Sequence, residues 1–197
     1  MKESLQLYQC SRDKFELREH LRTKRSKLSS SFVWLKSEQI SYSLIKELSL
    51  KLKKSDRIAL YSPIAGEVDT RLIDFEIRKL NKSVYYPKII GERMYFVKTN
   101  SLDDLSLGHF GIREPAGEKY ISISNLDIFI IPAIAIGLDG SRLGFGKGFY
   151  DKELEDVPRR KMFSAIFDFQ LVDKEFREEH DIKVDKVFTE KRVITIN

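Results

Sequence analysis

The apolar run from Ile128 to Ile136 is the feature that most restricts the fold of this chain. It contains Pro132 and is far shorter than the roughly 20 residues needed to cross a bilayer. Strands that are apolar on both faces indicate a sheet covered on both sides, which is typical of parallel sheets. We therefore predict a buried strand over residues 127–136 and expect no association with a membrane.

The rest of the chain alternates between helical and extended patterns, which favours a layered α/β fold. Helices are predicted over residues 11–28, 32–52, 70–80 and 149–156, with Ser11 as the N-cap of the first. Further strands are predicted over residues 57–62, 83–86, 93–98, 161–167 and 191–196. Pro87 is expected to end the strand at 83–86, and residues 101–119 are expected to be irregular. The prediction is an open fold with a mainly parallel sheet flanked by helices, forming a single domain over residues 1–197.

The composition indicates the cellular compartment and the partners to expect for this chain. The single cysteine, Cys10, excludes an intramolecular disulfide and favours a reducing compartment. The first twenty residues carry eight charged side chains and no apolar core segment, so no secretory signal is expected and a cytoplasmic protein is predicted. The net charge of +5 fits a solvated basic surface, or attraction to an anionic ligand. Basic and acidic residues are interspersed, so nucleic acid is not an expected partner. Nothing suggests an obligate interface, and a monomer is expected.

A glycine-rich basic loop follows the apolar run. Residues 140–148 hold four of the ten glycines together with Arg142 and Lys147. Glycines let backbone N–H groups approach an anion, and the two cations supply counter-charge, so the loop is typical of a phosphate site. It matches neither the P-loop, because Gly148 follows Gly146-Lys147, nor the dinucleotide fingerprint. The alternative is a tight glycine turn that packs a helix on the sheet.

Two other segments are expected beside this loop, because ligands of such folds bind beyond the carboxyl ends of the strands. They are residues 65–69 and the segment after Phe167. The first predicted helix adds a basic stripe beside an apolar one. The stripe consists of Lys14, Arg18, Arg22 and Arg25. From the residues alone, it is interpreted as a solvated helix face.

Five segments, in this order, resemble the 5-formyltetrahydrofolate cyclo-ligase family, also called methenyltetrahydrofolate synthetases. They are Lys14-Phe15-Glu16-Leu17-Arg18, Glu67-Val68-Asp69-Thr70, Phe110-Gly111-Ile112-Arg113-Glu114-Pro115, Arg142 to Asp151, and His180-Asp181-Ile182-Lys183-Val184-Asp185 with Thr189-Glu190. The resemblance covers nearly the whole chain. It implies that MgATP phosphorylates the formyl oxygen of 5-formyltetrahydrofolate, and that ring closure by N10 then gives 5,10-methenyltetrahydrofolate, ADP and phosphate.

The resemblance also implies roles for individual residues. ATP would be bound by Lys14, Arg18, Arg142, Gly144, Gly146, Lys147 and Gly148. Arg142 and Lys147 would neutralise the transferring phosphoryl group, and Arg142, Lys147 and Tyr150 would be the catalytic residues. The folate would be bound by Glu67, Phe110 and Tyr150, and Mg²⁺ by Asp151 and Asp185. From the residues alone, Glu67 is equally an exposed loop residue, Tyr150 and Phe110 are packing aromatics, Asp151 is a first-turn carboxylate, and Asp185 is a turn residue.

The chain departs from the family pattern at three places. Ala135-Ile136-Gly137 stands where Ala-Phe-Asp is usual, so the usual aspartate is absent, although Asp139 follows two residues later. Phe149 replaces a tyrosine, and Lys152 an arginine that is frequent in bacterial members. Other interpretations are a folate- or nucleotide-binding protein with lost or weak turnover, a nucleic-acid-binding module, and a sugar-phosphate isomerase or CoA transferase. The net positive charge would accommodate a polyglutamylated folate.

Overall fold

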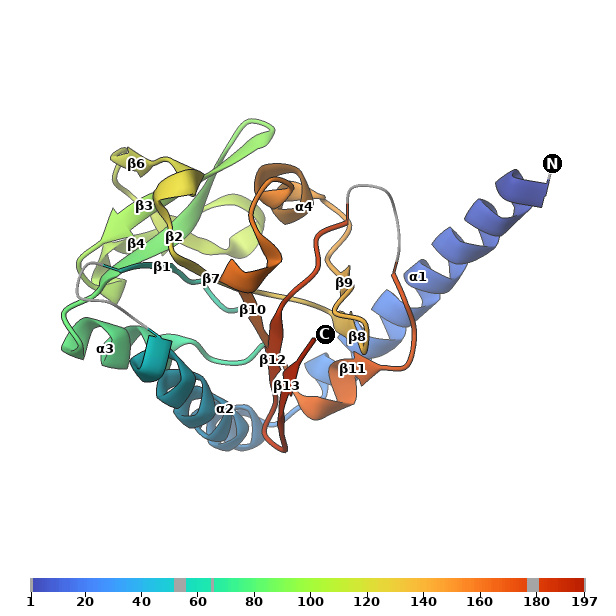
Figure 1. Ribbon diagram of the computed structural model, residues 1–197, viewed down its shortest axis with the longest axis horizontal. Helices are drawn as coiled ribbons and strands as arrows, with labels where there is room; N and C mark the ends of the chain where they lie inside the picture. Colours follow the sequence, from blue (N-terminus) through green and yellow to red (C-terminus); the bar gives the residue numbers. More distant parts are fainter. Residues whose placement is uncertain (1, 52–55, 65, 177–180, 197) are drawn as a thin grey trace.

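A central eight-stranded sheet organises the computed structural model (Figure 1). The structure describes residues 2–51, 56–64, 66–176 and 181–196, and the side chains of residues 2–12 and of Phe110 lie outside the description. The strand order is β13-β12-β10-β7-β1-β2-β3-β6. Their bounds are β1 Arg57–Ala59, β2 Ser83–Ile90, β3 Arg93–Thr99, β6 Tyr120–Ile121, β7 Ile128–Ile131, β10 Met162–Ala165, β12 Lys186–Phe188 and β13 Val193–Thr195.

The five middle strands of this sheet are parallel. β12 pairs with β10, β10 with β7, β7 with β1 and β1 with β2, all in the parallel sense. The antiparallel strands β13, β3 and β6 flank this parallel part. The predicted α/β fold with a mainly parallel sheet is confirmed.

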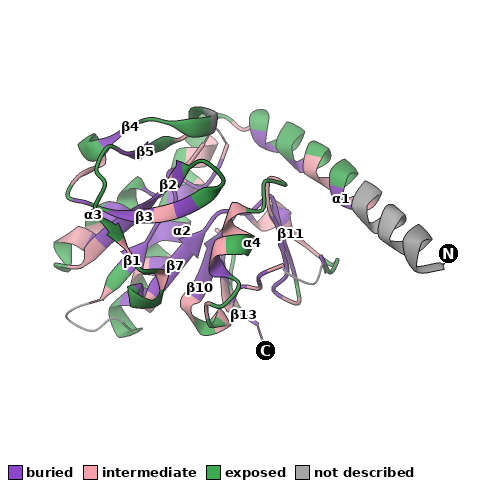
Figure 2. Cartoon of the chain, turned by 90° about the horizontal axis from the view of Figure 1, so that it is seen from above, coloured by how far each residue is buried: buried purple, intermediate pink, exposed green. Residues whose placement is uncertain are grey.

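Helices cover both faces of the sheet, which explains why its middle strands are apolar on both sides. The helices are α1 Lys2–Ser26, α2 Ser30–Lys51, α3 Arg71–Lys79 and α4 Phe149–Leu154. α2 and α3 pack on one face through Ile40, Leu44 and Ile73. α4 packs on the opposite face through Leu154, and all four residues of β7 are buried between these layers (Figure 2). No helix among the described residues is long and apolar enough to cross a membrane.

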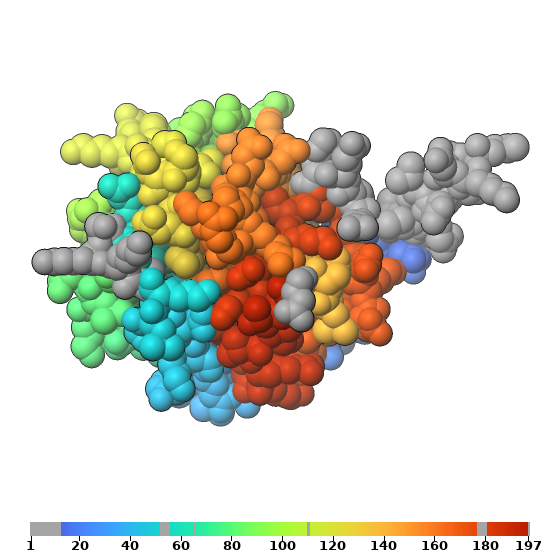
Figure 3. All heavy atoms as spheres, in the orientation of Figure 1, coloured from blue at the N-terminus to red at the C-terminus, as the bar shows by residue number. Residues whose placement is uncertain are grey.

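Two segments that are far apart in the sequence, α2 and the C-terminal strands, pack side by side. The space-filling view shows the cyan part of the chain in α2 beside the red C-terminal strands (Figure 3). An ion pair joins them, because Lys186 Nζ of β12 lies 2.6 Å from Glu47 Oε1 of α2. Its partner lowers the pKa of the Glu47 carboxyl.

Two predicted boundaries are clearly wrong, and a third lies outside the described residues. α1 begins at Lys2 and runs through Ser11 without a cap there, since no proline or glycine interrupts residues 2–26. α2 is described from Ser30 to Lys51, so its predicted end at Leu52 lies outside the described residues. β2 continues through Pro87 to Ile90 instead of ending at Tyr86. β1 pairs with β2 only as far as Tyr85, so beyond it the missing proline N–H costs no ladder bond on that side.

The apolar run itself is not one strand. β7 ends at Ile131, and after Pro132 the chain enters β8 (Ala135–Gly137), which belongs to a separate three-stranded sheet of order β11-β8-β9. Its other strands are β9 Arg142–Leu143 and β11 Leu171–Val172. A proline cannot donate to a ladder, so the run changes sheets there. This change directs the glycine-rich loop, whose residues 144–148 follow β9, over the carboxyl edge of the main sheet.

Smaller elements complete the chain. The region predicted to be irregular contains a β-hairpin, β4 Leu105–Leu107 and β5 Arg113–Pro115. β12 has no counterpart in the sequence prediction, because its three residues are too few for a periodic signal. The part of the chain that the structure describes also contains the 3₁₀ turns η1 Leu102–Asp104, η2 His109–Gly111, η3 Ile123–Asn125, η4 Arg159–Lys161 and η5 Asp168–Gln170.

The unusual Gly137 sits in a crowded turn. Asp139 Oδ1 accepts a hydrogen bond from Ser141 N at 3.1 Å, and its other oxygen pairs with Lys183. Lys183 and Ser141 lower the pKa of Asp139, although its burial opposes them. Asp139 thus secures this turn within the three-stranded sheet. A Cβ on Gly137 would overlap the backbone oxygen of Lys174 and lie 2.6 Å from Asp139 Oδ1.

We predict that Gly137→Ala destabilises the protein by about 1–3 kcal/mol, because the added methyl group must displace backbone. Gly117→Ala is the matched control, since its Cβ would lie 3.6 Å from Val97 Cγ1, an ordinary contact. Urea unfolding measures both variants. Equal midpoints for Gly137→Ala and Gly117→Ala would contradict the crowding described for this turn.

Candidate functional site

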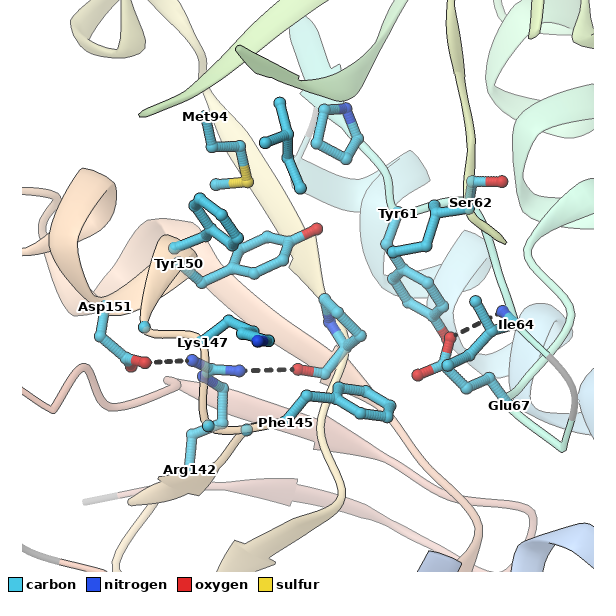
Figure 4. Close-up of a pocket in the computed structure, with 18 of the residues that line it drawn as sticks. Tyr61, Ser62, Ile64, Glu67, Met94, Arg142, Phe145, Lys147, Tyr150 and Asp151 are labelled. Atoms are coloured by element: carbon cyan, nitrogen blue, oxygen red, sulfur yellow. Dashed lines mark hydrogen bonds and ion pairs between the residues drawn. The ribbon is translucent and has the colours of Figure 1, made fainter. Parts of the chain in front are cut away.

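A cavity of about 340 Å³ lies at the carboxyl edge of the main sheet (Figure 4). The turn after β1 forms one wall, the glycine-rich loop and the start of α4 form the opposite wall, and β2 and β3 contribute an apolar side. The lining residues that the argument uses are Tyr61, Ile64, Glu67, Pro87, Ile89, Met94, Glu114, Pro132, Arg142, Gly144, Phe145, Gly146, Lys147, Gly148, Tyr150 and Asp151. Residues 65–69 and the loop were both predicted at this edge, and Ala65 lies outside the described residues.

Arg142 is the buried cation of the cavity, with 5% of its surface exposed. Its Nη1 donates to the Pro132 carbonyl at 3.2 Å, and its Nη2 lies 2.7 Å from Asp151 Oδ2 in the first turn of α4. The guanidinium also lies over the Tyr150 ring, 5.6 Å from its centroid. Gly144 makes this arrangement possible, because a Cβ there would come within 2.7 Å of Arg142 Nη1.

The glycine-rich loop turns sharply after β9. Gly146 and Gly148 have φ values of +87° and +69°, which L side chains rarely adopt. Lys147, between them, is exposed and points into the cavity (Figure 4). Arg18 of α1 holds the loop from outside, since its Nε donates to the Gly144 carbonyl at 2.9 Å. The loop therefore brings backbone, Arg142 and Lys147 to one side of the cavity, with Arg18 bonded to it from behind.

Glu67 faces this cationic side from the turn after β1. It is 7% exposed, and its Oε2 accepts a hydrogen bond from Ile64 N at 3.0 Å. Its Oε1 lies 3.4 Å from Nη2 of Arg25, a residue of α1 that is 3% exposed. Burial raises the pKa of Glu67, and the Arg25 charge opposes that rise.

Two tyrosines stand near this carboxylate. Tyr61 donates its hydroxyl to the Val68 carbonyl at 3.0 Å. Burial raises the pKa of Tyr61 and of Tyr150 well above the usual range. Both hydroxyls therefore stay protonated at neutral pH, and Tyr150, which lines the cavity, can donate a hydrogen bond to a ligand.

Some residues singled out in the sequence lie elsewhere. Lys14 is buried and pairs with Asp181 at 3.0 Å instead of lining the cavity. Asp185 precedes β12 at the amino end of the parallel strands and lies 3.8 Å from Arg159, so it is not brought to Asp151. The Phe110 side chain and His180 lie outside the described residues.

Three charged residues near the cavity were missed. Interpreting Arg25 as a solvated residue is wrong, because it is buried; Arg22 is exposed but lines the cavity. Spacing could have revealed Arg25, since it lies seven residues after Arg18, two helical turns along the face that buries Leu21. Glu114 lines the cavity at 6% exposure, and its Oε1 accepts no hydrogen bond from the described residues.

Comparison with known proteins identifies the group to which this site belongs. The model of the 5-formyltetrahydrofolate cyclo-ligase family matches residues 10–190. The chain belongs to this family. The cyclo-ligase of Mycoplasma pneumoniae is 30% identical over 184 residues, covering 91% of this chain and 99% of that protein. The Escherichia coli cyclo-ligase is 30% identical over 143 residues, covering 69% and 79%.

Solved structures agree with the family assignment. The 5,10-methenyltetrahydrofolate synthetase of Aquifex aeolicus matches with a TM-score of 0.80 and 36% identity, over 93% of this chain and 92% of that one. The synthetase of Mycoplasma pneumoniae matches with a TM-score of 0.73 and 26% identity, over 90% and 99%. Cyclo-ligases of this family are enzymes that convert 5-formyltetrahydrofolate into 5,10-methenyltetrahydrofolate.

We predict that Gly144→Ala lowers kcat/KM for this conversion about 100-fold, because its Cβ displaces the Arg142 guanidinium by a fraction of an ångström or more. Gly117→Ala again serves as the control. Product formation is measured by absorbance, and folding is checked by circular dichroism. Full activity of Gly144→Ala would show that the position of this guanidinium is not critical.

Proposed function

We propose that the cavity binds ATP and 5-formyltetrahydrofolate together and transfers the γ-phosphoryl group of ATP to the formyl oxygen. The observation that carries this proposal is the contrast between the cavity walls. One wall presents Arg142, Lys147 and glycine backbone, and the other presents the Glu67 carboxylate beside an apolar side. A phosphate-binding wall opposite a wall suited to a heterocycle with N–H donors supports a two-substrate site.

We assign the ATP phosphates to the glycine-rich loop. Arg18, Arg142 and Lys147 supply positive charge, and Gly144, Gly146 and Gly148 allow close approach of the backbone. Phosphoryl transfer depends chiefly on positioning and on neutralising the charge of the transferred group. For Lys14 to bind a phosphate as the resemblance implies, its ammonium must exchange Asp181 for the nucleotide.

We assign the folate to the opposite wall. The Glu67 carboxylate accepts hydrogen bonds from the amino and ring N–H groups of the pterin, and Pro87, Ile89 and Met94 contact its faces. Tyr150 donates its hydroxyl near the formyl group. The family resemblance assigns a substrate ring to Phe110, whose side chain lies outside the described residues. The positive charge of the chain fits a polyglutamylated folate.

The chemistry proceeds in two steps. The formyl oxygen attacks the γ-phosphorus, the bond from that phosphorus to the bridging oxygen breaks, and ADP leaves. N10 then attacks the activated carbon, the carbon–oxygen bond breaks with release of inorganic phosphate, and N10 loses its proton. Arg142 and Lys147 stabilise the charge on the phosphoryl group in both steps, and the cavity walls hold N10 near the carbon.

The residues of the site fit Mg²⁺ as the accompanying metal. Oδ1 of Asp151 is buried and accepts no hydrogen bond from the described residues, so a carboxylate oxygen remains for a hard cation. No group of three or more acidic, histidine or cysteine side chains among the described residues could hold a metal alone, in keeping with the reliance of Mg²⁺ on phosphates and water. When bound, Mg²⁺ neutralises charge on the phosphates. We propose Asp151 as its ligand, and Asp185 only after a movement that brings it to this edge.

We further propose that the protein acts as a monomer in the cytoplasm. The net charge of +5, with basic and acidic residues interspersed, supports this proposal because it favours small anionic substrates over nucleic acid.

The proposal predicts that the purified protein forms 5,10-methenyltetrahydrofolate only with MgATP, releasing one ADP and one phosphate per product. Lys147→Ala and Asp151→Asn are expected to lower kcat about 100-fold or more, because each removes charge stabilisation from the transfer step. Lys152→Ala is the control, because Lys152 is an exposed cation of α4 that directly follows Asp151 and does not line the cavity. Stopped-flow absorbance and phosphate release measure the rates.

Two results would contradict this proposal. Folate and ATP binding without turnover would assign the protein a binding role. Full activity in both Lys147→Ala and Asp151→Asn would refute the roles given to these residues.

A further inference from the structure

Arg25 of α1 stands directly behind the cavity without lining it. Its side chain is 4% exposed, and it contacts residues of both walls. On one side Nη2 lies 3.4 Å from Glu67 Oε1, and Nε donates to the Gly66 carbonyl at 3.1 Å. On the other side the guanidinium lies over the ring of Phe145 in the glycine-rich loop, 5.5 Å from its centroid.

The backbone around Arg25 is fitted to the same turn. Gly66 has a φ of +76°, and a Cβ there would lie 2.7 Å from the Arg25 carbonyl oxygen. α1 and the turn after β1 therefore meet backbone to backbone at this position. A guanidinium has five N–H donors in a rigid planar arrangement, so it can contact a carbonyl and a carboxylate at the same time. The ammonium group of a lysine does not reproduce this geometry.

The charge of Arg25 acts on a carboxylate that is otherwise hard to ionise. Glu67 is buried, and burial disfavours its charged form. The groups that act on it or respond to it most directly are Arg25 from α1, Tyr61 from the segment after β1, and Tyr150 from α4. Glu114 from β5 and Arg142 and Lys147 from the opposite wall line the same cavity. Both tyrosines are neutral at physiological pH, and Arg25 is the cation that pairs directly with Glu67 and favours its ionised form.

We propose that Arg25 is a positioning residue of the reaction, which orients the Glu67 carboxylate toward the folate and joins that wall to Phe145 of the phosphate-binding wall. The inference rests on the proposed function, because it gives Arg25 its effect through folate binding by Glu67. One buried guanidinium thereby sets the spacing of the two halves of the cavity.

The test compares Arg25→Met and Arg25→Lys with wild type and with Lys27→Met, which removes an exposed cation just beyond α1. For Arg25→Met, KM for 5-formyltetrahydrofolate rises about tenfold or more, as expected on losing a charge-assisted contact. The acid limb of kcat/KM moves upward by about 1–3 pH units, because Glu67 then ionises at higher pH. Lys27→Met keeps the wild-type values.

The conservative variant separates positioning from mere folding. Arg25→Lys restores the charge but not the fork, so the acid limb returns toward wild type while KM stays raised. This variant carries the test if Arg25→Met does not fold. In Glu67→Gln the acid limb disappears, and adding Arg25→Met changes KM little further.

Equilibrium binding of 5-formyltetrahydrofolate without ATP, titrated from acid to neutral pH, gives a second readout. A wild type that binds folate but shows no turnover would contradict the proposed function and leave the Arg25 shift measurable. Wild-type pH dependence of binding in Arg25→Met, or in Arg25→Lys if the former does not fold, would overturn the inference. So would a lowered stability accompanied by an unchanged acid limb.

Discussion

The buried guanidinium of Arg142 is the contact on which the site depends. It joins the carbonyl of Pro132, just past the end of β7, to the carboxylate of Asp151 in α4. It occupies the space that Gly144 leaves open. A buried cation is costly unless it is paired, so removing either partner would expose the other to a large penalty. The glycine-rich loop, α4 and the sheet edge are therefore positioned together.

Cations that bond to distant segments also lie along the inner face of α1. Lys14, Arg18 and Arg25 lie along this face at helical spacing, each bonded to a distant segment. Lys14 meets Asp181, Arg18 meets Gly144, and Arg25 meets Gly66 and Glu67. The helix acts less as a hydrophobic cover than as a row of cations that secures the loops around the cavity. Phosphate recognition and loop positioning thus draw on one set of charges.

The sequence predicted most of the elements because the middle strands are apolar on both faces and the helices are periodic. The prediction failed where the same residue type is compatible with two different local structures. Pro132 moves the chain to another sheet, whereas Pro87 lies within a strand, because only the neighbouring strands decide whether a missing N–H matters. The burial of Arg25 likewise depends on a carboxylate 42 residues away. The motifs correctly indicated five residues that line one cavity: Glu67, Arg142, Lys147, Tyr150 and Asp151. They did not reveal that Asp185 lies apart from this cavity, beside Arg159.

Phosphorylation of the formyl oxygen is the central claim about this cavity. It is tested most directly with 5-formyltetrahydrofolate that carries ¹⁸O in the formyl group. The account predicts that every molecule of released phosphate contains one ¹⁸O atom, because the formyl oxygen leaves bound to phosphorus. Unlabelled phosphate, with the label recovered in water, would contradict it.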